Sequence, residues 1–447
     1  MKHLTLLFAA TAAALVVHPE GNPQQTSLVE DKPQVAVQDA VQTWWNSLPN
    51  PESLFTAIES RIKTSLQHVG DVTKGLDFDP DSDSDDDGHP HPHPPHHPPR
   101  RGGRHHGDKT KTIYELIKDN KYTTKFAKLV EENDEIKSLL DDTEHNHTLF
   151  VPTDKAFEGI PHKPKEPPSK EFILSLLKYH ALPGLYTARH VLHSHTLPTE
   201  LSPDSLGDHP QRLRVSLGFL FSIRLNLYSK IVLSNIEAKN GVIHAVDGIL
   251  VPPPSQAKII SLLPGSFSTF SLGLEKTGLA DDLSKSDEAG GTLFAPTNRA
   301  FQKLGPGANA FLFSERGKKY LKAILKYHVV LGETLYSDAF YNKKKDDGDE
   351  ETNGYWHVDL PTQLDDKPLA VDVKSWKGFV EIVLNGFTKV AFKDGVASDG
   401  VVHVINSVLI PPHKHHGEAD ETEREYSVEE LKERLGPYVG GGEVRDL

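Results

Sequence analysis

Histidine is the residue type whose abundance and spacing in this sequence most suggest chemistry, as a metal ligand or as an acid–base group. The chain has 25 histidines and no cysteine, which excludes thiolate nucleophiles and thiolate metal sites. Seven of the histidines lie in a proline-rich stretch between residues 89 and 106. Repeated X-Pro steps favour an extended backbone, so these imidazoles do not readily converge on one ion. We expect no physiological metal and no cofactor; the weak metal candidates are His89, His91, His93, His96 and His97.

Four other histidines occur in two matched pairs. One pair follows a tyrosine at the end of an apolar helical pattern, and the other lies within an apolar strand pattern. They are Tyr179-His180 and Tyr327-His328, and His244 and His403. We interpret His244 and His403 as buried, hydrogen-bonded structural residues, because no carboxylate accompanies them at a known metal spacing. The alternative is a metal site or an acid–base pair made by His180 with His244.

Sequence patterns typical of catalysis are missing from the chain. It contains no H-E-x-x-H, G-x-S-x-G, G-x-x-x-x-G-K-[ST] or G-x-G-x-x-G. We therefore predict that the protein is not an enzyme and has no catalytic residue. The alternative is a lumenal hydrolase or carbohydrate-processing enzyme, with its site at a domain junction near residues 263–269.

An internal repeat positions these histidines. Thr148 to Phe157 reads TLFVPTDKAF, and Thr292 to Phe301 reads TLFAPTNRAF. Each copy predicts a short strand, a proline that ends it, and side chains able to cap a helix N-terminus. Each repeat then closes with an apolar strand, GVIHAVDGILVP from Gly241 and GVVHVINSVLIP from Gly400. The predicted capping residues are Thr153, Asp154, Thr297 and Asn298.

The repeat divides the chain into two domains, predicted at 109–254 and 266–412. Apolar spacing predicts helices within 112–140 and at 171–179, 270–283, 320–327 and 428–435. Alternating apolar residues predict strands at 213–234, 357–360, 369–373, 379–385 and 388–392. Residues 413–447 are expected to form a polar C-terminal tail.

The N-terminal region has the pattern of a secreted precursor. Lys2 precedes an apolar run from Leu4 to Val17 that is too short to span a bilayer comfortably. We predict a signal peptide at 1–18, with an uncleaved anchor as the alternative. Residues 19–108 form a largely disordered leader, with an acidic run followed by the His/Pro-rich linker. Asn146 begins the glycosylation sequon Asn-His-Thr.

The three ordered motifs resemble those of the fasciclin-type (FAS1) domain. They are the T-x-F-x-P-T-x-x-A-F segment, the Tyr-His pair and the closing G-x-x-H strand, and each occurs twice between residues 109 and 412. The resemblance implies an α+β fold of two tandem domains, each a β-sandwich-like wedge with packed helices. It also implies non-catalytic adhesion or binding to cell-surface, wall or matrix proteins or glycans. Tyr179, His180, Tyr327 and His328 are the candidate interaction residues that it implies.

The same resemblance suggests where the protein acts. The chain is similar to fungal secreted or vacuolar FAS1 proteins, so we expect it in the secretory pathway, in the vacuole or at the extracellular cell wall. The formal net charge of −14 argues against a nucleic-acid partner, which would need a basic surface. We also expect no transmembrane helix in the mature chain.

Overall fold

The structure is a computed structural model. It describes residues 107–158, 168–218, 222–280, 288–342, 350–351, 354–365, 367–376, 379–412 and 425–439. The predicted signal peptide, nearly all of the leader and the weak metal candidates His89, His91, His93, His96 and His97 lie outside these residues. Each of the two sequence repeats forms a domain around its own seven-stranded sheet, and this confirms the α+β class.

The first domain begins with three short helices. Its helical elements are α3 Ile113–Lys118, α4 Thr124–Glu131, α5 Asp134–Asp141, η1 Asp154–Phe157, α6 Lys170–His180, α7 Ala188–His193 and η2 Asp204–Leu206. Its strands are β1 His147–Pro152, β2 Ala181–Pro183, β3 Thr196–Pro198, β4 Arg212–Leu217, β5 Ile223–Leu225, β6 Ser229–Ala238 and β7 Gly241–Val246. The strand order in the sheet is β2-β1-β7-β6-β5-β4-β3.

The second domain repeats this sheet and adds helices and a small extra sheet. Its helices are α8 Gln256–Leu262, α9 Pro264–Thr277, α11 Asn298–Lys303, α12 Pro306–Leu312, α13 Lys318–Tyr327 and α14 Val428–Val439. The strand order in its main sheet is β13-β14-β15-β16-β17-β8-β9. These strands are β8 Gly291–Pro296, β9 Val329–Leu331, β13 Tyr355–Pro361, β14 Pro368–Trp376, β15 Phe379–Leu384, β16 Thr388–Ala397 and β17 Gly400–Ile405. The extra sheet has three strands, which are β10 Glu333–Leu335, β11 Ala339–Asn342 and β12 Glu350–Glu351.

The two sequence motifs of each repeat are neighbours in the sheet. Strand β1 runs parallel to β7 with Phe150 opposite His244, and β8 runs parallel to β17 with Phe294 opposite His403. All six residues of β1 and of β8 are buried. A strand with both faces buried reads as a continuous apolar run, which is why TLFVP and TLFAP do not alternate.

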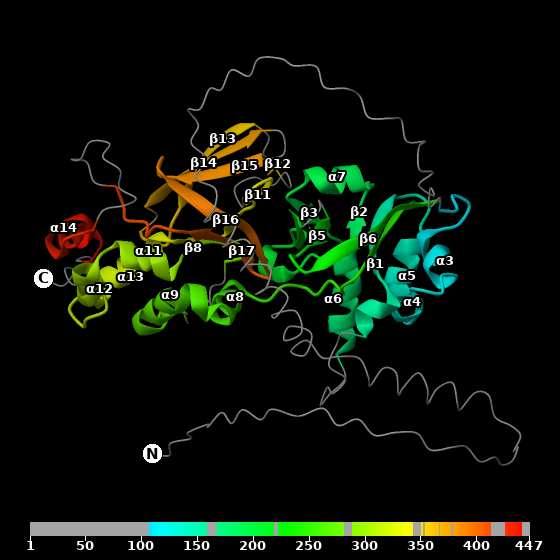
Figure 1. Cartoon of the computed structure of the whole chain (residues 1–447), viewed down its shortest axis with the longest axis horizontal. Helices are drawn as coiled ribbons and strands as arrows, with labels where there is room; N and C mark the ends of the chain where they lie inside the picture. Colours follow the sequence, from blue (N-terminus) through cyan, green and yellow to red (C-terminus); the bar gives the residue numbers. More distant parts are fainter. Residues whose placement is uncertain are drawn as a thin grey trace, which may run out of the picture. The chain divides into compact units, whose positions relative to one another are not determined.

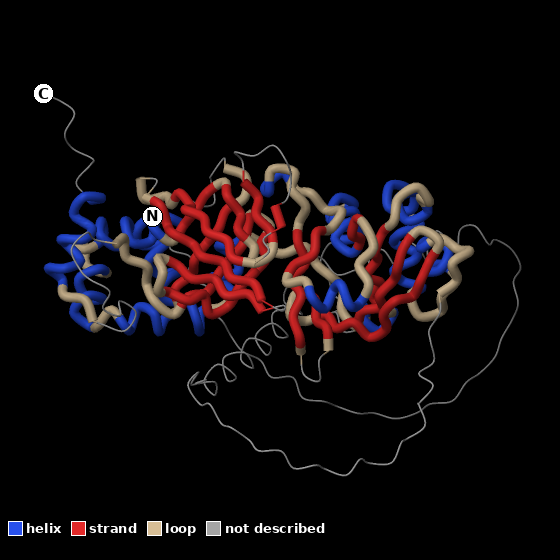
Figure 2. The backbone as a smooth tube through the Cα atoms, turned by 90° about the horizontal axis from the view of Figure 1, so that it is seen from above, coloured by secondary structure: helices blue, strands red, loops and turns tan. Residues whose placement is uncertain are grey.

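Helices cover the second sheet on one side. Helices α9, α11, α12, α13 and α14 gather there, apart from the strands (Figures 1 and 2). Phe267 and Phe270 of α9 and Leu321 and Ile324 of α13 enter the core that these helices share with the sheet. Their spacing of three places each pair on one face of its helix, and burial of that face stabilises the layer.

Several segments differ in detail from what their sequences predict. Residues 263–269, where a junction cleft was the alternative, begin α9, and Phe267 is buried in the second domain. The helix predicted at 428–435 is present as α14, and its fully buried Leu431 and Leu435 make it part of the second core rather than of a polar tail. These two leucines are four residues apart and share one helix face, which is the apolar spacing that predicts this helix. The strand region 213–234 is divided into β4, β5 and the start of β6.

Candidate interaction site

The first Tyr-His pair ends α6 inside the protein. His180 is fully buried, and its Nε2 accepts a hydrogen bond from the Leu250 backbone N–H at 3.0 Å. Because Nε2 accepts, the ring proton lies on Nδ1, which donates to the Leu176 carbonyl at 2.7 Å. Burial lowers the pKa of His180 to about 4. The imidazole is therefore neutral at physiological pH and joins α6 to the strand-like segment after β7.

The second Tyr-His pair repeats these contacts. His328 Nδ1 donates to the Ile324 carbonyl at 2.8 Å, and its Nε2 accepts from the Leu409 N–H at 2.9 Å. This ring is also fully buried, and burial lowers its pKa to about 4. Both histidines lie away from the surface, so they cannot contact a ligand as the candidate interaction role required.

The tyrosine of the first pair supports a hairpin. The Tyr179 hydroxyl donates to the Arg212 carbonyl at 3.0 Å and accepts from Asn226 Nδ2 at 2.8 Å. Arg212 begins β4, and Asn226 follows β5 with a positive φ of 47°. Tyr179 is fully buried, and burial raises its pKa well above 10. It therefore acts as a neutral hydrogen-bonding group that fixes the β4–β5 hairpin.

Tyr327 does the same in the second domain. Its hydroxyl donates to the Pro368 carbonyl at 3.2 Å and accepts from Asn385 Nδ2 at 3.2 Å. Pro368 begins β14, and Asn385, with a φ of 50°, follows β15. Burial raises the pKa of Tyr327 to about 12. Tyr327 therefore positions the β14–β15 hairpin without reaching the surface itself.

His244 and His403 also use both ring nitrogens within the fold. His244 Nε2 donates to the Tyr186 carbonyl at 2.8 Å and Nδ1 accepts from the Asn235 N–H at 3.4 Å. His403 Nε2 donates to the Leu335 carbonyl at 2.7 Å. Burial lowers the pKa of both rings. Neither His180 nor His244 has a nitrogen left for a metal, and no group of three or more metal-ligating side chains occurs among the described residues.

The predicted capping residues act differently in the two repeats. Thr297 caps α11 by accepting from the Ala300 N–H at 3.3 Å, whereas Thr153 makes no cap hydrogen bond to η1. The Asp154 carboxylate instead accepts from the Lys125 N–H at 2.9 Å, at the start of α4. Asn298 Oδ1 accepts from the Thr269 N–H at 2.8 Å, inside α9. Both residues after the threonine thus tie the motif to a preceding helix.

A buried polar cluster joins the two repeats. The Asp338 carboxylate of the second domain accepts from the N–H groups of His195 at 2.9 Å and Thr196 at 2.7 Å, and also from the Thr196 hydroxyl. Arg212 Nε donates to the Thr196 hydroxyl at 2.6 Å, and its Nη1 donates to the Tyr341 hydroxyl at 3.3 Å. Burial raises the pKa of Asp338, and the Arg212 charge opposes that shift. The carboxylate and the guanidinium are therefore linked through the Thr196 hydroxyl, which both of them bond.

Further contacts extend the junction along the outer face of β4. Arg214 Nε donates to the Lys393 carbonyl at 3.0 Å, and its guanidinium lies over the Phe392 ring at 4.3 Å. Gln211 Nε2 donates to the Ala397 carbonyl at 3.1 Å. Burial lowers the pKa of Arg214 to about 10. The second domain therefore covers these residues of β4 and of the segment just before it.

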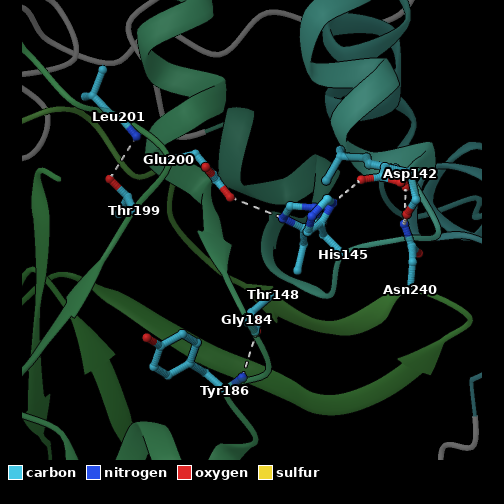
Figure 3. A network of polar contacts seen from close by, with 11 residues as sticks. Asp142, His145, Thr148, Gly184, Tyr186, Thr199, Glu200, Leu201 and Asn240 are labelled. Carbon is cyan, nitrogen blue, oxygen red and sulfur yellow. Dashed lines mark hydrogen bonds and ion pairs between the residues drawn. The ribbon is translucent and has the colours of Figure 1, made fainter. Parts of the chain in front are cut away.

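The loop before β1 carries the glycosylation sequon. Asn146 is exposed, whereas Thr148 is fully buried. The Thr148 hydroxyl donates to the Gly184 carbonyl at 2.7 Å and accepts from the Tyr186 N–H at 2.8 Å (Figure 3). His147 lies 3.2 Å from Glu200 in the same network. The sequon asparagine is therefore accessible at the rim of a well-ordered polar network.

The exposed part of the second sheet contains residues that the sequence interpretation missed. Tyr355, Trp376 and Phe379 are exposed on β13, β14 and β15. Each lies in a strand where more exposed and less exposed residues alternate, and this alternation could have identified them as outward-facing aromatic residues. Among the described residues, they are the aromatic side chains best placed to meet an external partner. As for membranes, none of the described helices combines the length and apolar character needed to cross one.

Comparison with known proteins agrees with this architecture. The fasciclin domain model matches residues 121–252 and 265–411. Aurofusarin biosynthesis cluster protein S of Gibberella zeae is 30% identical over 357 residues, covering 73% of this chain and 86% of that protein. A fasciclin-like arabinogalactan protein of Arthroderma benhamiae is 24% identical over 317 residues, covering 67% of each chain.

A solved structure also matches. It is a FAS1 domain pair from the insect cell adhesion molecule fasciclin I, with 18% sequence identity and a TM-score of 0.31. The match covers 64% of this chain and 96% of that chain. On the evidence of the two matched regions and the Gibberella zeae relative, this chain belongs to the fasciclin domain family and carries two copies of the domain in tandem.

Proposed function

We propose that this protein is a non-catalytic adhesion or interaction protein of the secretory pathway, which binds cell-surface, wall or matrix proteins or glycans through its outward faces. The observation that supports it most is the use of the motif side chains. His180, His328, His244 and His403 each direct both ring nitrogens to the backbone. Groups committed in this way support the fold and leave binding to the exposed strands and loops.

The kind of relatives supports the same proposal. They include proteins of the adhesion and matrix type, such as the fasciclin-like arabinogalactan protein. In this proposal the Tyr-His pairs contribute indirectly, because Tyr179 and Tyr327 hold the hairpins that carry outward residues. Two linked domains that bind at once would add avidity without any new contact. Delivery to the vacuole or the cell wall and glycosylation at Asn146 belong to the same proposal.

The test measures whether components of the cell wall or vacuole bind the full-length mature protein. A tagged copy is localised in the producing cell, and the purified protein is incubated with wall and vacuolar extracts and recovered with its partners. We expect saturable retention that excess untagged protein competes away. A protein that remains unbound in both extracts contradicts the proposal.

A second candidate function comes from the name of the Gibberella zeae relative. That protein is named for a biosynthesis cluster, so this chain could serve a biosynthetic pathway, as an enzyme or as a partner of one. Deletion of the corresponding gene, followed by profiling of secreted small molecules, tests this candidate. An accumulated precursor that the purified protein converts would favour catalysis over adhesion.

A further inference from the structure

One corner of the second sheet presents three large aromatic side chains to solvent. Tyr355 of β13 is 66% exposed, Trp376 of β14 is 67% exposed and Phe379 of β15 is 76% exposed. Single exposed apolar residues are ordinary, but adjacent ones mark contact surfaces. These three residues, with the polar residues between them, are called the aromatic face below.

Strand register places the three rings side by side. Trp376 lies opposite Phe379, and Tyr355 lies opposite Lys374, two residues before Trp376. Lys374 in turn lies opposite Glu381. Because side chains directly opposite in a sheet share a face, all five point outward together. With neighbouring strands about 4.8 Å apart, the aromatic face spans roughly 10 Å from β13 to β15 (Figure 1).

Hydrogen-bonding groups are interspersed with the rings. The Tyr355 hydroxyl donates to Asp372 Oδ1 at 2.7 Å, and His357 Nδ1 lies 2.8 Å from the same oxygen. Within the described part of the chain both contacts use Oδ1, so Oδ2 of Asp372 can accept from a ligand. Glu381 forms an ion pair with Lys389 at 2.7 Å. The aromatic face thus combines apolar rings with acceptors and donors and mixes charges of both signs.

The aromatic face lies on an extension of the second sheet that the sheet of the first domain does not have. The tyrosine contacts to Arg212 and Pro368 align β4 with β14, which makes Leu217 the counterpart of Val373. Strand β4 ends at Leu217, whereas β14 continues for three residues, through Trp376. Strand β13 has seven residues and β3 has three. The aromatic face therefore adds surface beyond what the fold shared by the two domains requires.

A role in stabilising the sheet explains only the smaller, buried part of each aromatic ring. A cross-strand Trp–Phe pair stabilises a hairpin end. However, Trp376 and Phe379 leave two thirds or more of their surface in water, so most of each ring does not contact the sheet. The inward residues of β14 and β15 provide the packing instead; they are Leu369, Val371, Val373, Val380 and Ile382.

We propose that the aromatic face binds a chain of uncharged hexopyranose units, an inference that rests on the proposed function and specifies its ligand. A pyranose ring has an apolar C–H side that stacks on Trp376, Phe379 or Tyr355, and hydroxyl groups at its edge. Those hydroxyls need acceptors and donors once water is displaced, and Asp372, Glu381 and Lys374 supply them. Anionic membranes and nucleic acids fit poorly, because Asp372 and Glu381 lie among the rings and repel phosphate.

The experiment measures sedimentation of the full-length protein with insoluble β-glucan, chitin and mannan. We expect saturable binding to at least one of them, with competition by its soluble oligosaccharide. Each of the variants Trp376→Ala, Phe379→Ala and Tyr355→Ala should bind more weakly, with an apparent Kd raised by roughly three- to tenfold. Tyr122→Ala is the matched control, because Tyr122 is a comparably exposed tyrosine, 63%, in the first domain. Circular dichroism and Tm establish that each variant is folded.

The outcomes separate this inference from the broader function. If Trp376→Ala does not fold, Trp376→Tyr, which keeps a stacking ring, should bind, and Glu381→Gln should bind more weakly. Wild-type protein that is retained by extract proteins but by none of the polysaccharides overturns this inference and leaves adhesion standing. Retention by neither overturns both. Binding that the three alanine variants share with wild type, or binding to phosphatidylserine vesicles alone, also overturns the inference.

Discussion

The Nε2 atom of His180 accepts a hydrogen bond from the backbone N–H of Leu250 at 3.0 Å, although 70 residues separate them in the sequence. His328 and Leu409 form the same contact in the second domain. An imidazolium cannot accept this bond, since both of its nitrogens carry protons. The contact therefore makes the fold depend on neutral histidine.

Acid should destabilise the protein in a defined window. The pKa of His180 and of His328 is about 4 when folded, against 6.5 for free histidine. Above pH 6.5 both states are neutral and stability is complete; as pH falls towards 4 the unfolded state takes up protons first. Each ring should then cost about 3 kcal/mol of unfolding free energy. Urea titrations at pH 7.5, 6, 5 and 4 measure this loss.

The matched variants for this window are His180→Gln and His193→Gln. His180→Gln removes one titrating ring, so stability at pH 7.5 should fall while its slope between pH 6.5 and 4 becomes smaller. His193 is exposed on α7, so its replacement is the control for losing a histidine at the surface and should leave stability at pH 7.5 nearly unchanged. Equal slopes in wild type and His180→Gln would contradict the assignment.

The polar cluster between the repeats should be intolerant of losing one charge. Asp338→Asn removes the carboxylate that shares the Thr196 hydroxyl with Arg212, and with it a buried negative charge that attracts the guanidinium. We expect a loss of roughly 3 kcal/mol in unfolding free energy, measured by urea denaturation. The exposed Asp119→Asn serves as the control and should show no measurable change. A double variant with Arg212→Met that is less destabilised than the sum of the two single variants would demonstrate the coupling.

Helix α14 should contribute to stability although it follows the second repeat. Leu435 is fully buried in the second core, so Leu435→Ala should lower the unfolding free energy by roughly 3 kcal/mol. Leu272 is 53% exposed on α9, and Leu272→Ala should change it by less than about 0.5 kcal/mol. Equal effects in the two variants would mean that α14 is not docked in solution.

Asn146 should carry a glycan in the secreted protein. Endoglycosidase digestion should increase the electrophoretic mobility of the wild-type chain, and Asn146→Gln should abolish that shift. Thr148→Ser keeps both the sequon and the hydroxyl that bonds Gly184 and Tyr186, so it should retain the shift. An undigested mobility equal to that of Asn146→Gln would show that the site is unused.

Local patterns in the sequence were sufficient to predict the tandem repeat and the order of the motifs, and the α+β class was implied by the resemblance of those motifs to the FAS1 domain. The TLFVP and TLFAP runs identify buried strands because a continuous apolar run indicates burial on both faces. Thr297 could be predicted as a cap because capping involves neighbours only three residues away. The same reasoning failed at Thr153, where Asp154 bonds α4 instead, since that helix lies far back in the sequence.

Contacts between distant segments were decided only by the tertiary structure. The sequence shows that His180 ends a helix, but its burial follows from the pairing of its Nε2 with Leu250. Alternation along β14 indicates that Trp376 points outward, but its place beside Phe379 depends on strand register. Register is determined by turns and by the packing of the whole sheet, so three aromatic residues that look isolated in the sequence form one surface in the fold.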